Sequence, residues 1–462
     1  MISFAQVVER ALNGPTCSER DFDLGFFVPN LQRVLKTYGI QYEPQNPIPA
    51  DDDLADRVWA AAIDFLVETG VYCSDTERRI LFTRDEIKGA LEAGPRGTLF
   101  GEGTDAQGMP RRKPEDSIPP WCSVGAGGSP VSSEWNLLNL VKAYAENPLG
   151  DSVTTPSLTN VDGQRIVAGS PLGMEGAIRT MFLVREALRR AGRPGMPIVN
   201  GIATGVRAQE HVAGHRFGIR QTDALEIGTY HEMKIDFDSL NKVSYSLSTG
   251  SLIFAENGVI LGGLAGGPAG VAVVTTAYNP VDLLVLRGAV QHPFPTHFDL
   301  GTTSTRDTIW ARSLANQAVT RNSTLPVVNI GYGGAGPMTR MIFYEFAAWV
   351  IGSVVSGGSI EAGGSAKGAA EDRTSPMEPV FASEVAHAVA GMSRKEANQI
   401  VGQLLPLYED KLHDPPAGQK YQECCDVTSG VPNKDFVKLY REVRQEMVDR
   451  FGLKLPTGSP YL

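Results

Sequence analysis

Short apolar runs alternate with helical segments over most of this chain, and this repeat restricts the folds open to it. Each run is bounded by glycine, proline or polar residues, as is typical of buried parallel strands. The runs that we expect to be strands are Trp121–Ala126, Ser152–Pro156, Pro197–Ile202, Asp223–Gly228, Ser251–Glu256, Thr296–Thr302, Pro326–Tyr332 and Ser359–Gly364. The periodic segments between them that we expect to be helices include Met174–Ala191, Phe237–Leu247, Asn279–Val290, Asp307–Thr320 and Met338–Val355.

Strands that alternate with helices in one direction are typical of two α/β folds. Eight such units favour a (β/α)8 TIM barrel. A doubly wound parallel sheet would account for six strands almost as well. The first strand is not followed by the glycine fingerprint of dinucleotide-binding sheets, and we therefore predict the barrel.

The chain outside the barrel is expected to be largely helical. Apolar periodicity predicts helices at Leu54–Glu68 and at Thr83–Ala93, the second with Thr83 as N-cap. The Pro-rich stretch Met109–Pro120 separates this region from the first strand. We expect an N-terminal helical and irregular extension over residues 1–117, the barrel over 118–395, and a C-terminal helical segment over 396–462.

The composition narrows the classes of function. A formal net charge of −10 over 462 residues argues against binding to nucleic acids or acidic membranes. The five cysteines have no metal-binding spacing. Neither a signal-peptide segment nor an apolar run of transmembrane length is evident. We expect a reduced, soluble, cytoplasmic protein.

Polar residues gather at the carboxyl ends of the expected strands, where barrels of this kind place their active sites. They are Asn200, Asp223, Glu226, Glu256, His297, Asp299, Asn329, Tyr332 and Glu361. Burying the three carboxylates of Glu226, Glu256 and Asp299 together would be too costly for a protein core without cations to pair with them. Either they form a cation-binding mouth, or some of them turn to the helix layer and pair with Arg or Lys. Asp223 and Asp299 fit the second alternative better than the two glutamates do.

Two histidine motifs and several glycine clusters are weaker indications of a functional site. His297 would serve either as a general acid or base or as an orienting residue. His211 and His215 are four residues apart, but no Glu follows the first, so we expect no metal site. Glycine clusters beside the strands indicate a face where a ligand approaches the backbone closely. These clusters are Gly125–Gly128, Gly262–Gly267, Gly331–Gly334 and Gly357–Gly364.

The segment Ala191–Gly201 ends a helix and leads into a strand whose last polar residue is Asn200. It resembles the pyrrolysine-bearing strand of the archaeal monomethylamine:corrinoid protein methyltransferases, with Asn200 at the position of pyrrolysine. Further segments resemble that family in the same order along the chain. They are Gly101–Ala106, Gly128–Pro130, His231–Asp238, Gly262–Gly267, Thr305–Thr308, Ala335–Pro337, Ser365–Gly368 and Pro416–Cys424.

The resemblance implies a homo-oligomeric, hexameric barrel that moves a methyl group from an amine to the Co(I) of a separate corrinoid protein. The cobalamin would then belong to the partner and would not be bound tightly by this chain. Glu226 and Glu256 match two acids around the pyrrolysine ring, Tyr332 matches a site residue, and Ile330 stands where the family has glutamine. On this basis we assign catalysis to Glu226, Glu256 and Asn200. Substrate binding is assigned to Tyr332, Ile330, His297 and Asp223.

Without pyrrolysine the chain lacks the electrophile that captures an amine. We therefore expect a donor that carries its own activation, such as a quaternary amine of the betaine type. A tertiary-amine or O-methyl donor would instead need a protonated Glu226 or Glu256 as general acid. A non-catalytic relative that binds a small cation stays possible. A glycosidase-like carboxylate pair is disfavoured, because among the tryptophans only Trp121 lies near a strand end.

Overall fold

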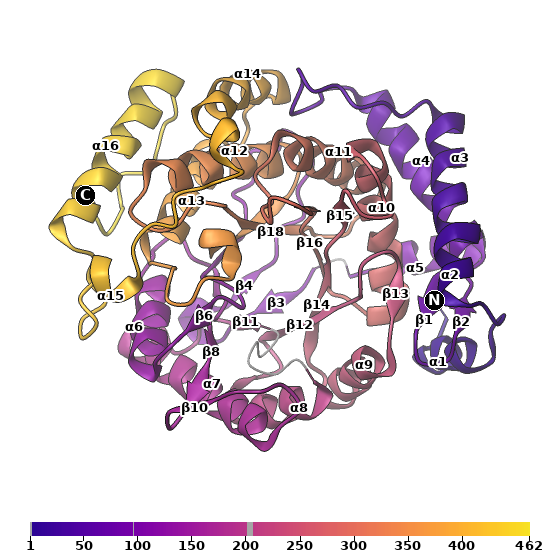
Figure 1. Cartoon of the computed structure of the whole chain (residues 1–462), viewed down its shortest axis with the longest axis horizontal. Coiled ribbons are helices and arrows are strands. Elements are labelled where there is room, and N and C mark those ends of the chain that lie inside the picture. Colours follow the sequence, from indigo (N-terminus) through magenta and orange to yellow (C-terminus); the bar gives the residue numbers. More distant parts are fainter. Residues whose placement is uncertain (1, 96, 201–206) are drawn as a thin grey trace.

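A closed ring of parallel strands forms the centre of the molecule (Figure 1). The computed structural model describes residues 2–95, 97–200 and 207–462. Two four-stranded sheets make up the ring within this described part. The first contains β11 (Val199–Asn200), β12 (Ala224–Gly228), β14 (Leu252–Asn257) and β16 (Val290–Pro293). The second contains β18 (Val328–Tyr332), β19 (Ser359–Gly364), β5 (Cys122–Val124) and β7 (Ser152–Val153).

Isolated parallel bridges join the two sheets at both seams. Val153 pairs with Ile198 at one seam, and Gln291 pairs with Val327 at the other. The eight strands therefore follow one another around a closed barrel, as the sequence predicted.

Helices surround the ring and cover its outer face (Figure 1). They are α6 (Glu134–Ala145), α7 (Pro171–Arg190), α8 (Ala208–Gly218), α9 (Phe237–Thr249), α10 (Pro268–Val281), α11 (Arg306–Asn322), α12 (Arg340–Val355) and α13 (Met377–Ala388). One helix, Pro268–Leu286, is apolar and long enough to cross a membrane, but 94% of that window is buried in the fold. This burial is the property of a core helix.

The interior of the barrel changes from apolar to polar along the strands. A dry cluster that includes Trp121, Ala224, Phe254, Val290 and Val328 fills one end. Side chains alternate between the two faces of a strand, so the residues two positions further on also point inward. These residues are Glu226, Glu256, His292 and Ile330. The polar layer therefore lies directly above the dry cluster, toward the carboxyl ends of the strands.

The sixth strand is not where the sequence analysis expected it. We expected a helix at Asn279–Val290 and a strand at Thr296–Thr302, but the helix ends at Leu286 and the barrel strand is Val290–Pro293. This strand is four residues long, carries two polar side chains and ends in proline, so it lacks an apolar pattern. Thr296–His297 forms β17 instead, which pairs with β15 (Ile260–Leu261) in a separate two-stranded sheet.

Both ends of the chain pack against the barrel from outside, on opposite sides in Figure 1. The expected N-terminal helices are present as α4 (Asp52–Thr69) and α5 (Arg84–Glu92). At the other end, α14 (Arg394–Leu404) packs on α12, and α16 (Lys434–Phe451) also contacts it. The boundaries at 117 and 395 stay predictions.

Candidate functional site

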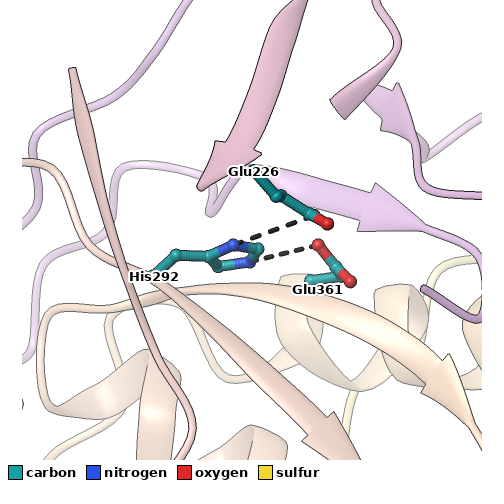
Figure 2. Close-up of side chains that lie close together, drawn as sticks. All are labelled: Glu226, His292 and Glu361. Carbon is teal, nitrogen blue, oxygen red and sulfur yellow. Dashed lines mark ion pairs between the residues drawn. The ribbon is translucent and has the colours of Figure 1, made fainter. Parts of the chain in front are cut away.

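Two carboxyl groups and one imidazole converge inside the barrel, and we call Glu226, His292 and Glu361 the acid–histidine cluster (Figure 2). They come from β12, β16 and β19. Nδ1 of His292 lies 3.8 Å from Oε1 of Glu226, and Nε2 lies 3.1 Å from Oε2 of Glu361. His292 is 0% exposed and Glu361 3% exposed. The Glu226 side chain is 11% exposed, so the cluster is shielded from water except at this residue.

Burial determines the protonation of this cluster. Burial and the neighbouring Glu361 raise the pKa of Glu226 well above its ordinary value. Burial also raises the pKa of Glu361 to about 8, and the two carboxyl groups are hydrogen-bonded to each other. Burial lowers the pKa of His292, so the imidazole is neutral. The carboxyl pair therefore retains a proton at neutral pH.

Glu256 adds a third carboxyl group to the polar layer. On β14 it pairs in register with Gly228 on one side and with His292 on the other. A Cβ on Gly228 would lie 3.6 Å from Oε2 of Glu256, so the carboxylate extends over that glycine. Burial raises the pKa of Glu256, while His292 and Lys242 act against the rise.

Tyr332 and Ile330 extend the site along β18. The phenol oxygen of Tyr332 lies 2.7 Å from the hydroxyl oxygen of Thr296 on β17. Burial raises the pKa of Tyr332, and Glu256 adds to the rise. Ile330 is two residues earlier and half-buried, facing the same side. Asn200 ends β11, where its Cα pairs with Leu225, but its side chain lies outside the described residues.

A glycine allows Glu361 to occupy its position. A Cβ on Gly127, in the loop after β5, would lie 2.7 Å from Oε1 of Glu361 and 2.8 Å from Cγ2 of Thr154. The Thr154 side chain also faces this carboxyl group and lowers its pKa. The first glycine cluster therefore admits a side chain of the chain itself, where we expected a ligand.

We expect Gly127→Ala to destabilise the protein by about 1–3 kcal/mol, because the added methyl group overpacks a filled position. The free energy of unfolding in urea measures this loss. Gly267→Ala is the control, since a Cβ there would meet nothing within 4 Å. Equal stability of the two variants would contradict the close approach at Gly127.

Two assigned substrate-binding residues lie elsewhere. Asp223 precedes β12, at the end of the strand opposite the mouth. Its carboxylate accepts from the backbone N–H of Ile198 at 2.9 Å and of Arg220 at 2.6 Å, and it pairs with Arg185. Asp223 thus anchors the start of the strand. The prediction that it lies at the mouth of the barrel is wrong.

His297 lies on β17 and not on a barrel strand. Its backbone N–H donates to the Thr302 carbonyl at 3.0 Å, and its side chain is half-buried. The neighbouring Asp299 is exposed. The histidine inside the barrel is His292, five residues earlier, which the sequence analysis missed. Applying the two-residue alternation to Val290–Pro293 would have found it.

Both of the paired histidines on α8 are buried. His215 contacts Ser251 Oγ at 2.7 Å through Nε2 and Tyr245 Oη at 3.2 Å through Nδ1. The acid–histidine cluster, by contrast, brings three potential ligand atoms within 4.8 Å of one another, close enough to hold a metal ion. A metal ion there would displace the proton between the two carboxyl groups. The absence of a metal stays a prediction, which analysis of the metal content of the purified protein would test.

The chain is similar to known proteins over nearly its whole length. Residues 2–453 match the family model described as monomethylamine methyltransferase MtmB. Monomethylamine methyltransferase MtmB of Methanosarcina mazei is 31% identical over 444 residues, which cover 96% of each chain. MtmB3 of Methanosarcina barkeri is 32% identical over the same share.

Two solved structures are also similar to this chain. The crystal structure of Methanosarcina barkeri MtmB matches with a TM-score of 0.93 at 30% identity, covering 97% of this chain and 98% of that one. The structure of the hydroxylamine complex of MtmB matches equally well. The chain therefore belongs to the MtmB family of monomethylamine methyltransferases.

Proposed function

We propose that this chain moves a methyl group from a small methylated ammonium ion, most simply a quaternary one, to the cobalt of a partner corrinoid protein. The observation that carries the proposal is the layer of three carboxyl groups, Glu226, Glu256 and Glu361, above a dry cluster. Membership in a methyltransferase family supports the transfer itself.

The charge of the polar layer suits a permanent cation. The polar layer combines three carboxyl groups with a neutral imidazole, so any net charge that it carries is negative. In a low-dielectric interior this charge attracts a cation strongly. A quaternary ammonium ion needs no hydrogen-bond partner, and the ring of Tyr332 would add a cation–π contact of about 0.5–2 kcal/mol.

The chain would accelerate the transfer mainly by positioning the methyl donor. When the methyl group leaves, the C–N bond breaks and both of its electrons stay on nitrogen, so the departing amine is neutral and needs no proton. The reduced corrinoid of the partner supplies the nucleophile. Holding the donor so that its methyl group faces the open end of the barrel supplies several kcal/mol through proximity.

The raised pKa values of Glu226 and Glu361 favour a second candidate donor, a tertiary amine or an O-methyl compound. Here the proton shared by the two carboxyl groups would pass to the nitrogen or oxygen as the methyl group leaves. A relative without activity would bind the cation and transfer nothing.

An assay of methyl transfer separates these possibilities. The purified chain is mixed with a reduced corrinoid protein and a panel of quaternary, tertiary and O-methyl donors, and methylcobalamin is followed by absorbance. We expect a quaternary donor to react at a rate that does not fall as the pH rises from 6 to 9. A rate that falls through the pKa of the carboxyl pair would favour the second candidate, and no transfer from any donor would refute both.

The partner and the assembly are part of the same proposal. Co-purification with a corrinoid-binding protein and light scattering after gel filtration would test the expected partner and the homo-oligomeric state.

A further inference from the structure

Arg312 is a buried arginine whose donors are mostly unused. It lies on α11 and is 1% exposed. Nη2 donates to the carbonyl of Ile330 at 3.0 Å, and the guanidinium carbon lies 5.2 Å from the ring centre of Trp349. Nε and Nη1 are buried and have no hydrogen-bond partner within the described residues. A guanidinium group has five N–H donors, and leaving them unpaired in a dry interior is costly.

A second buried arginine shows how the fold satisfies such a side chain when its role is structural. Arg112 is 4% exposed and donates through all three nitrogens to backbone carbonyls. The acceptors are Ile118, Val354, Gly358 and Asp116. Arg312 has only one such acceptor, and this difference points to an acceptor that enters from outside the chain.

The backbone pattern places Arg312 beside the mouth. Successive carbonyl groups of a strand point alternately to its two neighbours. The carbonyl of Pro326 accepts from β16 and that of Val327 accepts from β19, so the carbonyl of Ile330, four residues after Pro326, points to β16. In this register the residue opposite the Ile330 carbonyl is Pro295, two residues beyond the end of β16, and proline has no N–H to donate. The guanidinium group of Arg312 takes this position. The guanidinium group therefore lies between the carboxyl ends of β16 and β18. It is close enough to Tyr332 to interact with it electrostatically.

We propose that Arg312 binds a carboxylate of the methyl donor, so that the substrate is a zwitterion. This inference rests on the proposed function, because the ammonium end would face Glu226, Glu256 and Glu361. Nη1 and the second hydrogen of Nη2 would hold the carboxylate end-on. Burial lowers the pKa of Arg312 to about 9, which leaves the guanidinium group charged at neutral pH.

Calorimetric titration of the full chain with three ligands tests the proposal. They are trimethylammonioacetate, which carries both charges, tetramethylammonium, which has only the cation, and acetate, which has only the anion. We expect the zwitterion to bind at least tenfold more tightly than tetramethylammonium. Arg312→Met should abolish this preference and leave the affinity for tetramethylammonium unchanged. Arg321→Gln is the control, because Arg321 lies on the same helix and is paired with Asp52 and Asp56.

The outcomes separate this inference from the proposed function. Equal affinity for the zwitterion and for tetramethylammonium in the unmodified protein would overturn the role of Arg312 and leave the cation site intact. Arg312-dependent binding of acetate without a preference for the zwitterion would show a site for a free anion and would also overturn it. If neither cationic ligand binds, the proposed function itself fails. Should Arg312→Met not fold, Arg312→Gln is used, because the amide is also uncharged and the same loss of preference is expected.

Discussion

Replacing Glu226 with Gln is expected to lower kcat/KM for methyl transfer about 100- to 1000-fold. Glu226 lies in the acid–histidine cluster, where burial and Glu361 already raise its pKa. The amide leaves the pair with a single ionisable carboxyl group, which can either hold the proton or carry the charge that faces the cationic donor, but not both. Losing one partner of a buried ion pair costs about 3–5 kcal/mol, and 1.4 kcal/mol corresponds to a factor of ten in rate. Stopped-flow formation of methylcobalamin measures the change.

Asp299→Asn is the matched control, because it removes one acid from the exposed loop after β17 and leaves the interior unchanged. We expect less than a twofold effect there. The division of the loss between kcat and KM is also informative. A rise in KM alone would indicate that Glu226 only binds the cation, whereas a fall in kcat would indicate a contribution to the transition state. A Glu226→Gln variant with unchanged kcat/KM would contradict the proposed site.

The sequence predicted the barrel because seven of the eight expected strands carry a readable apolar run between helices. The exception, β16, shows what such a pattern cannot reveal. Its inward residues are Val290 and His292, and its sheet partners hold it in place by backbone hydrogen bonds. The preceding helix ends at Leu286 and is capped by Arg287, whose φ of 60° is a conformation usually signalled by glycine. Tertiary pairing, and not local composition, defines this strand.

The site was predicted in part for the same reason. Glu226 and Glu256 lie on long strands whose alternation is clear, so their inward direction follows from the sequence. Asp223 lies one residue before its strand, and only the fold shows that Arg185 and two backbone amides use its carboxylate. His292 was missed because its strand was missed. The role of Glu361 depends on contacts with residues more than 60 positions away, which no local pattern reports.

The stability of the protein should fall as the pH rises from about 5 to about 8, and Glu361 should account for a large part of the fall. Its pKa rises from 4.5 in an unfolded chain to about 8 in the fold. A raised pKa means that the folded state holds the proton more tightly, so the contribution is complete below pH 4.5 and is lost as the pH passes 8. The loss is on the order of a few kcal/mol.

Urea unfolding at pH 5, 7 and 8.5 checks this expectation in the unmodified protein and in Glu361→Gln, whose amide cannot ionise. The variant should lose less stability than the unmodified protein over this range, so that the difference between them shifts in favour of the variant at pH 8.5. Other buried acids such as Glu378, whose pKa is raised to about 7, contribute to both curves and cancel in the comparison. Asp56→Asn is the control whose difference from the unmodified protein should stay constant over this range, because Arg321 lowers the pKa of Asp56 from 3.8 and its stabilisation is lost only at lower pH. Parallel curves for Glu361→Gln and the unmodified protein would mean that Glu361 is ionised in the fold. The carboxyl pair would then not retain the proton that we assign to it, and our description of the charge of the polar layer would be wrong.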